Sequence, residues 1–400
     1  MDFLRNDEER EILAGLRRAV DECIAPRAAA VDMEGLFPAE NFADLHRAGL
    51  IGMAVAPEYG GLGCGLHGNV LVAVTAVEEL ARGCSSTCQV FHNHNGCIGI
   101  PNYLGTPDQQ QRFSREIVTD GAMHVIWGGE TGKHVYDIKT VAKPVAGGYL
   151  INGTKVFSSG SAGATWFQLT ALVEGKALTD GMIIPLVRRD NPGVTVHDNW
   201  DAMGQRGTAS GTTVYEDCFV PTEDVLGAPG DYYKLLLFGP FFQLGWAALY
   251  VGLARGALEA AVEYVRSNSR PWADAPIERA VEDPYIRGHV ADMSIRVEAA
   301  RQLLYVAARA IERAHIDPAN RPEAAIAVYR AKVLATEAAL DVTSRIFQVM
   351  GARAAGKRTN NFDRYWRNVR TFTLHDPVDW KRHTIGEYLL EGTPPPVGWY

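Results

Sequence analysis

Hydrophobic side chains in the first 120 residues recur at the spacing of three and four residues that is typical of amphipathic α-helices. A first helix, which Asp7 can cap, carries four of them on one side: Ile12, Leu13, Leu16 and Val20. Pro38 stands where a second helix begins, because proline is favoured in a first turn. Glycine and proline then separate further helices, predicted over residues 68–82, 85–104 and 107–119. The pattern predicts an N-terminal α-helical domain over residues 1–122.

After residue 122 the pattern changes to short β-prone runs that glycine interrupts. Such runs include residues 139–142, 149–151, 166–173 and 182–187. Gly147-Gly148 between two of the runs fits a hairpin turn, since glycine adopts the positive φ that tight turns need. We predict a small central antiparallel, barrel-like β-domain over residues 123–229.

Beyond Pro229 the helical spacing returns, over residues 241–268, 284–315, 322–350 and 377–390. It predicts a C-terminal four-helix bundle over residues 230–400, so the fold class is α+β. Residues 235–254 carry no charge and are long enough to cross a membrane. Gly239-Pro240 interrupts this segment and the helical pattern continues into charged residues, so we interpret it as a buried core helix.

The composition is that of a globular protein, with 47% hydrophobic and 22% charged side chains among 400 residues. A net charge of -8 without any Lys/Arg-rich block argues against a nucleic acid partner, so a small-molecule substrate is expected. The six cysteines form no Cys-x-x-Cys pair, and residues 1–10 are too charged for a secretory leader. We expect reduced thiols in a cytoplasmic protein that does not enter a membrane.

Five strings in order along the chain carry a family resemblance. They are Ala-Pro-Glu-Tyr-Gly-Gly-Leu-Gly at 56–63, Gly-Thr-Pro-Asp-Gln-Gln at 105–110, Gly-Tyr-Leu-Ile-Asn-Gly-Thr-Lys-Val-Phe at 148–157, Met-Gly-Gln-Arg-Gly-Thr at 203–208 and Phe-Val-Pro-Thr-Glu-Asp-Val-Leu-Gly at 219–227. Together they resemble the acyl-CoA dehydrogenase superfamily over nearly the whole chain. The resemblance implies a flavin between the β-domain and the bundle, usually in a homotetramer (a dimer of dimers).

The catalytic glutamate of the superfamily's dehydrogenases has no counterpart. Thr373 or its neighbours occupy one of its two family locations, and residues 364–386 contain no glutamate. No acidic residue between Asp231 and Glu259 fills the other location. Without a carboxylate base, α-proton abstraction has no agent. An acyl-CoA dehydrogenase with an unrecognised base, and a catalytically inactive binding protein of this fold, stay open as alternatives.

Three further strings resemble the flavin-dependent monooxygenase branch of the superfamily, of the dibenzothiophene monooxygenase type. They are Ser-Arg-Pro-Trp at 269–272, Gly-Ala-Arg at 351–353 and Trp-Arg-Asn-Val-Arg-Thr-Phe-Thr-Leu-His-Asp-Pro at 366–377. The resemblance implies that Arg270, and Arg353 with Ala354 from a neighbouring subunit, hold the flavin phosphate. FMN is favoured over FAD, because Arg353 stands where the dehydrogenases have small glycines that admit a dinucleotide.

His375 is the candidate catalytic residue. A histidine side chain, with its ordinary pKa near 6.5, can give or take a proton at working pH. Asp376-Pro377 reads as an N-cap followed by proline at the first helical position, which places His375 just before a helix N-terminus. The positive helix end is expected to keep the ring mostly neutral. A structural histidine packed against Trp380 is the alternative.

Family position also suggests groups that surround the flavin ring and the substrate. Candidates for the polar flavin rim are Trp127, Gly128, Gly129, Glu130, Thr131, Gly132, Phe157, Ser158, Ser159 and Ser161. Candidates for the substrate pocket are His92, His94, Asn95, Trp200, Ser210, Phe241 and Phe242. His92 and His94 are two residues apart, so on a helix they point in different directions and no metal site is predicted.

The resemblance implies oxygen addition at flavin C4a, assisted by His375, and oxygen transfer to a sulfur, nitrogen or aromatic carbon of an apolar substrate. No Gly-x-Gly-x-x-Gly motif following a strand is evident for nicotinamide binding. We therefore expect a separate NAD(P)H:flavin reductase to supply FMNH2.

Overall fold

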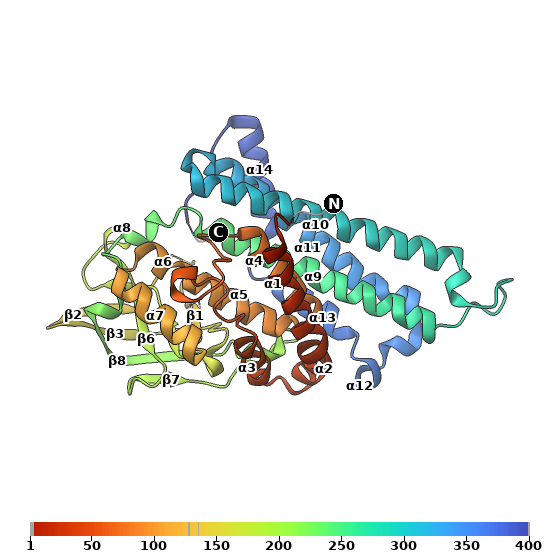
Figure 1. The fold of residues 1–400 in the computed structure, drawn as a ribbon, viewed down its shortest axis with the longest axis horizontal. Coiled ribbons are helices and arrows are strands. Elements are labelled where there is room, and N and C mark those ends of the chain that lie inside the picture. The colour runs from red at the N-terminus through yellow and green to blue at the C-terminus, as the bar shows by residue number, and fades with distance from the viewer. Residues whose placement is uncertain (1–3, 127–128, 135, 399–400) are drawn as a thin grey trace.

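The computed structural model describes residues 4–126, 129–134 and 136–398 of the chain. A curled sheet forms one end of the molecule, and three long helices extend away from it at the other end (Figure 1). The N-terminal helices lie across the junction between the two ends (Figure 1). This arrangement confirms the predicted α+β fold of a helical domain, a β-domain and a helical domain.

The N-terminal part is helical, with a π-helical turn, Val20–Ile24, between its first two helices. Asn6 rather than Asp7 caps α1, because the Asn6 side chain accepts the backbone N–H of Glu9 at 2.9 Å. The helix α5 is buried along its whole length, between the sheet and the bundle. The helices are α1 Asp7–Ala19, α2 Ala25–Glu34, α3 Ala39–Arg47, α4 Val70–Gly83, α5 Ser85–Gly99, α6 Pro101–Leu104 and α7 Pro107–Asp120.

Nine described strands form one sheet in the order β1-β4-β6-β5-β2-β3-β8-β7, with β9 paired to β6. Most neighbours are antiparallel, but β1 pairs with β4 and β2 with β5 in parallel. The predicted β2–β3 hairpin is present; its turn is Ala146-Gly147, with φ of +80° at Gly147, while Gly148 already belongs to β3. The bounds are β1 His124–Ile126, β2 Val141–Val145, β3 Gly148–Lys155, β4 Trp166–Gln168, β5 Ala171–Val173, β6 Met182–Arg188, β7 Val194–Val196, β8 Thr213–Pro221 and β9 Val225–Leu226, with α8, Leu178–Gly181, before β6.

The C-terminal part consists of three long helices that pack on one another, α9 Phe238–Ser267, α10 Pro284–Ile316 and α11 Arg321–Met350. The helix α14, Val378–Glu391, packs on α11, and α4 packs along α9 and α10. Two further helices precede α14: α12, Lys357–Asn360, and α13, Asp363–Phe372.

The uncharged segment 235–254 is largely the buried first half of α9, as predicted for a core helix. A Cβ on Gly252 would collide with the Glu78 carbonyl, so this glycine permits the close approach of α4. Of the helices that the structure describes, none combines the length and apolar character that crossing a bilayer requires. One apolar core runs through the N-terminal helices and the bundle, and a second fills the sheet.

Candidate functional site

His375 lies in the turn after α13, where its ring packs against the bundle. The ring centroid is 5.4 Å from that of Phe372 and 5.7 Å from that of Trp246 on α9. The side chain is 37% exposed. Trp380 instead places its ring 5.3 Å from that of His383 on α14. His375 therefore faces α9, which does not fit the alternative of a histidine packed on Trp380.

The predicted cap beside His375 is wrong. The helix α14 begins at Val378 with Pro377 in the cap position, and no side chain caps it. Asp376 points inward instead, where Lys332 of α11 hydrogen-bonds its Oδ1 and Lys381 of α14 lies 3.3 Å from its Oδ2. A cap contributes about 1 kcal/mol, whereas a buried lysine left without its counterion costs several. The buried lysine therefore decides where the carboxylate points.

His92 lies on α5 and contacts the first turns of α9, so it links the two helices. Its ring centroid is 4.5 Å from that of Trp246, and its Nε2 donates to the Phe242 carbonyl at 3.2 Å. A Cβ on Gly245 would collide with this ring. Burial lowers the pKa of His92 to about 4, so the ring is neutral at physiological pH. His92, Phe241 and Phe242 thus form one aromatic cluster, which reaches His375 through Trp246.

A chain of hydroxyl groups lines the face of the sheet domain that meets α5. Thr208 donates to the Gln205 carbonyl at 2.8 Å, so it accepts in its 2.7 Å contact with Ser210. Ser210 therefore accepts from Ser159, also at 2.7 Å. Gln89 of α5 donates its amide N–H to Ser159 Oγ at 3.0 Å. All three hydroxyl protons are committed, which leaves Ser159 able only to accept from a ligand.

Several buried polar atoms near these hydroxyl groups have no hydrogen-bond partner among the described residues. Ser158 Oγ and Gln89 Oε1 are buried, as is Asn95 Oδ1 further along α5, and no described residue hydrogen-bonds any of them. Phe157 adopts a φ of +58° and leaves its ring 63% exposed beside Trp200. An open aromatic ring on strained backbone, beside unpaired polar atoms, fits a planar ligand with an apolar body and a polar rim. The isoalloxazine ring of a flavin has this character.

The structure treats the remaining candidates for the flavin rim differently from one another. Gly129 accepts the backbone N–H of Val156 at 2.7 Å, which brings it beside Phe157. The Glu130 carboxylate is not available for a flavin, because it pairs with Lys155 and accepts the N–H of Thr140. Trp127 and Gly128 lie outside the described residues. Thr131 is exposed and Gly132 half-buried, while Ser161 donates to the Ala209 carbonyl at 2.8 Å.

His94 is a structural residue, contrary to its selection as a pocket candidate. Its Nε2 donates to the Ile51 carbonyl at 3.1 Å, and its Nδ1 accepts the backbone N–H of His124 at 3.0 Å. Burial lowers the pKa of His94 to about 4. Both nitrogens are therefore used: Nε2 joins α5 to the turn after α3, and Nδ1 joins α5 to β1.

The Lys155–Glu130 ion pair, 1% and 8% exposed, gives a stability prediction. Lys155→Met leaves a buried carboxylate without its counterion, so the free energy of unfolding is expected to fall by about 3–5 kcal/mol in urea titrations. Lys139→Met is the control, because its side chain is 63% exposed and solvent screens its ion pair with Asp137. Equal unfolding midpoints for the two variants would contradict the assignment.

Arg270 and Arg353 lie together at the far end of the bundle. Ser269 donates its hydroxyl to the Met350 carbonyl at 3.1 Å, which joins the segment after α9 to the segment after α11. Both arginines are exposed, and neither forms an ion pair with a described carboxylate; Ala354 is buried. From Trp246 to the end of α9 at Ser267 the helix extends roughly 30 Å. The arginines are therefore remote from His375 of the same chain.

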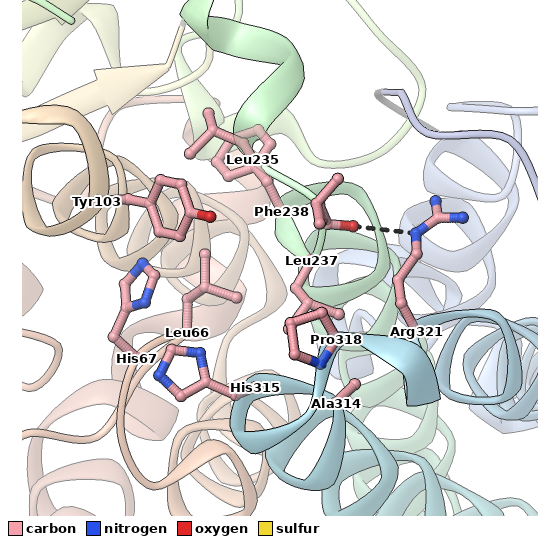
Figure 2. A pocket seen from close by; sticks show the side chains of 11 residues that line it. Leu66, His67, Tyr103, Leu235, Leu237, Phe238, Ala314, His315, Pro318 and Arg321 are labelled. Carbon is pink, nitrogen blue, oxygen red and sulfur yellow. Dashed lines mark hydrogen bonds between the residues drawn. The ribbon is translucent and has the colours of Figure 1, made fainter.

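A separate pocket of about 100 Å³ opens where α6, the start of α9 and the end of α10 meet. Figure 2 shows the rings of His67 and His315 next to each other on one side of the pocket, whose lining also includes Leu66, Leu235 and Phe238. None of the predicted site residues lines it. Phe238 separates it from the His92 cluster, since its ring lies 4.7 Å from that of Phe242.

Sequence reasoning missed three residues that connect the site: Gln89, Trp246 and Lys332. Lys332 had a usable signal. It falls on the apolar stripe of α11 formed by Ala325, Val328, Ala335 and Ala339, where a charged side chain has to be buried. Gln89 and Trp246 lie on helical segments that are buried on all sides, so periodicity does not single them out.

Profiles of the acyl-CoA dehydrogenase N-terminal, middle and C-terminal domains match residues 6–120, 129–218 and 244–380. A dibenzothiophene monooxygenase of Mycolicibacterium goodii is 34% identical over 400 residues, covering 96% of this chain and 94% of that protein. The probable FMNH2-dependent monooxygenase SfnC of Pseudomonas putida is 32% identical, over 99% of this chain and 98% of that one. The crystal structure of FMN-bound TdsC from Paenibacillus sp. A11-2 matches with a TM-score of 0.92 at 32% identity, covering 98% of this chain and 100% of that one.

Proposed function

The chain belongs to the acyl-CoA dehydrogenase superfamily, in its flavin-dependent monooxygenase branch, and we propose a function on this premise. In the proposal, the protein uses FMNH2 and O2 to oxygenate a small aromatic or heteroaromatic molecule. The observation that supports this most is the imidazole of His375 in the loop where the dehydrogenases hold a glutamate. The adjacent Asp376 carboxylate is engaged by Lys332 and Lys381, so it is not available as a substitute base.

FMN is the cofactor, and it supplies the oxygen chemistry when bound: its reduced ring reacts with O2, one oxygen atom passes to the substrate and the other leaves as water. In the proposal, the unpaired polar atoms of Ser158, Gln89 and Asn95 hold the polar rim, with Phe157 and Trp200 against the ring. His375 Nε2 holds and moves a proton. The aromatic cluster around His92 keeps water from the reacting atoms.

In the proposal, the residues that bind the FMN phosphate belong to a second copy of the chain. Arg270 and Arg353 lie roughly 30 Å along α9 from Trp246, which is more than the length of an FMN molecule. An FMN that contacts His375 would therefore receive these arginines from a neighbouring subunit. This arrangement requires at least a dimer in which each subunit completes the site of the other, and the homotetramer that the family resemblance implies contains such pairs.

The substrate in this proposal is apolar and ring-shaped, because the side chains between His92 and His375 are aromatic and buried. Its oxidised atom is a sulfur, a nitrogen or an aromatic carbon. FMNH2 comes from a separate NAD(P)H:flavin reductase, in keeping with the relative that is named FMNH2-dependent.

The direct test supplies the protein with FMN, a generic flavin reductase, NADH and a panel of small aromatic sulfides, indoles and phenols. We expect substrate-dependent oxygen uptake and a product heavier by one oxygen atom, followed by mass spectrometry. The reductase and flavin without the protein are the control. If no compound is oxygenated above this control while the protein binds FMN, the proposal fails.

The dehydrogenase alternative predicts a different result. A dehydrogenase bleaches its oxidised flavin when an acyl-CoA is added without a reductant. The only carboxylate described beside His375 is committed to two lysines, so we expect the absorbance of bound FMN near 450 nm to stay unchanged with butyryl-, octanoyl- and benzoyl-CoA. Bleaching by any of the three would favour the dehydrogenase.

A further inference from the structure

A buried ion pair lies directly behind the His375 loop. Lys332 of α11 and Asp376 are hydrogen-bonded to each other, with side chains 1% and 4% exposed. Lys332 also donates to Gln243 Oε1 of α9, and Lys381 of α14 lies 3.3 Å from the other Asp376 oxygen. Lysine and aspartate are rarely buried, because each loses its hydration. Three helices nevertheless direct polar groups to this one point.

The ion pair constrains the hydrogen-bonding state of the imidazole. Asp376 Oδ1, which accepts from Lys332, also lies 3.5 Å from His375 Nδ1. Burial by itself would raise the pKa of Asp376, but the charge of Lys332, together with His375 and Lys381, more than offsets burial and lowers this pKa well below its ordinary value. An ionised carboxylate can only accept a hydrogen bond, so the ring nitrogen that faces it has to carry the hydrogen. A neutral His375 then keeps its lone pair on Nε2.

The imidazole is also held by its ring neighbours. Phe372 and Trp246 lie 5.4 Å and 5.7 Å from it, centroid to centroid, and restrict its rotation. Phe372 is itself fixed, since Tyr250 donates its hydroxyl to the Phe372 carbonyl at 3.0 Å. With the ring plane restricted and Nδ1 directed at Asp376, the carboxylate decides which nitrogen is left for proton transfer.

We infer that Lys332 is a positioning residue for His375: by keeping Asp376 ionised and in place, it fixes the Nδ1–H tautomer and leaves Nε2 to move the proton. This inference rests on the proposed role of His375. The tautomer and the titration of the ring can nevertheless be measured on the protein without flavin, so a failure here is distinguishable from a failure of the proposed function.

The charges around the ring determine the sign of each expected change. Asp376 is negative, and Lys332 and Lys381 are positive. Burial lowers the pKa of Lys332 to about 8, against the attraction of Asp376, so this lysine stays charged where a histidine titrates. Other groups on the packed elements are the neutral Gln243 and Trp246 of α9, the neutral His92 of α5 behind Trp246, and Arg370 of α13, which donates to Thr373. Tyr250 of α9 and Tyr329 of α11 also face Asp376, and burial raises the pKa of both, so both stay neutral where a histidine titrates.

Removing the positive charge of Lys332 makes protonation of His375 easier, and removing the negative charge of Asp376 makes it harder. We expect Lys332→Gln to raise the titration midpoint of the ring by about one pH unit and Asp376→Asn to lower it by about the same amount. Lys332→Arg, which retains the charge, should keep the native midpoint. A simple loss of packing would not shift the midpoint in opposite directions in Lys332→Gln and Asp376→Asn.

The measurement is a ¹H–¹³C correlation spectrum of the flavin-free, full-length protein labelled with [¹³Cε1]histidine, recorded from pH 5 to 9. The His375 signal is assigned by its loss in His375→Gln. Lys234→Gln is the control, because this lysine is 65% exposed and its ion pair is with Asp231, outside the group of charges around His375. If both neutral variants shift the midpoint in the same direction, or neither shifts it, the inference is overturned. If Lys332→Gln does not fold, Asp376→Asn and Lys332→Arg decide the question.

The tautomer gives a second readout. In protein that carries uniformly ¹³C-labelled histidine, the native ring is expected to show the ¹³Cδ2 chemical shift of the Nδ1–H form, and Asp376→Asn a mixture of both forms. In reductase-coupled assays Lys332→Gln should raise the hydrogen peroxide formed per NADH several-fold, and Lys332→Arg should restore coupling. A native ring in the Nε2–H form would also overturn the inference, whatever the protein oxygenates.

Discussion

Replacing His375 with alanine is expected to leave FMN bound while the yield of oxygenated product per NADH falls roughly a hundredfold or more, the size of effect typical of a lost acid–base group. The Nε2 that moves the proton is gone, so the activated oxygen is released as hydrogen peroxide before it reaches the substrate. The ring packs against Phe372 and Trp246 and the side chain is 37% exposed, so the fold should tolerate its removal. Product analysis, peroxide measurement and FMN titration of the same preparation check the product yield, the peroxide release and the FMN binding in turn.

His383→Ala is the matched control for this variant. His383 is a histidine of α14 whose side chain is 60% exposed and lies 3.9 Å from Glu387. Its removal should leave both product and peroxide at native levels. Native product yield from His375→Ala would show that another group moves the proton. Loss of FMN together with product would instead assign His375 to cofactor binding.

Replacing Arg270 or Arg353 with alanine is expected to weaken FMN binding about tenfold to a hundredfold each, the usual effect of removing one charge-assisted hydrogen bond to a phosphate. Neither guanidinium pairs with a described carboxylate, so each is available for an anion. Riboflavin, which lacks the phosphate, should bind native protein and variants with similar affinity. Fluorescence titration with FMN and with riboflavin measures the difference.

Arg313→Ala is the control for the arginines, because this exposed residue lies in the last turn of α10, at the other end of the bundle. It should bind FMN like the native protein.

A second experiment mixes subunits of two inactive variants. Since the arginines are remote from His375 within one chain, a mixture of Arg353→Ala and His375→Ala subunits should regain activity if subunits exchange. An equal loss of FMN and riboflavin affinity in the arginine variants would contradict a role in phosphate binding.

The three-part architecture could be predicted because it follows from local periodicity. Helical spacing, β-prone runs and glycine or proline between them are properties of neighbouring residues, and the helices over residues 284–316 and 321–350 lie within a few positions of their predicted bounds. The helix α13 was not predicted as a separate element, since residues 366–372 were taken only as part of a motif. The domain limits at residues 122 and 229 stay predictions.

The errors at the site all concern competition between partners that are distant in sequence. Asp376-Pro377 is a good local cap signal, yet the carboxylate turns to Lys332, which lies 44 positions earlier. Glu130 and His94 were chosen for their chemistry, but Lys155 and two backbone groups occupy their polar atoms. A side chain that fits a ligand by type is unavailable when the fold has already used its hydrogen-bonding groups.

The sequence by itself determined the order of elements, the family resemblance, the missing glutamate and the presence of His375, because each of these is written in residue identity and spacing. Only the tertiary structure decided that His375 faces Trp246 rather than Trp380, and that three helices enclose the lysine behind it. It also placed Arg270 beside Arg353 and far from His375. The physical reason is that burial and pairing are properties of the packed chain: a buried charge has to find its counterion wherever the fold places it.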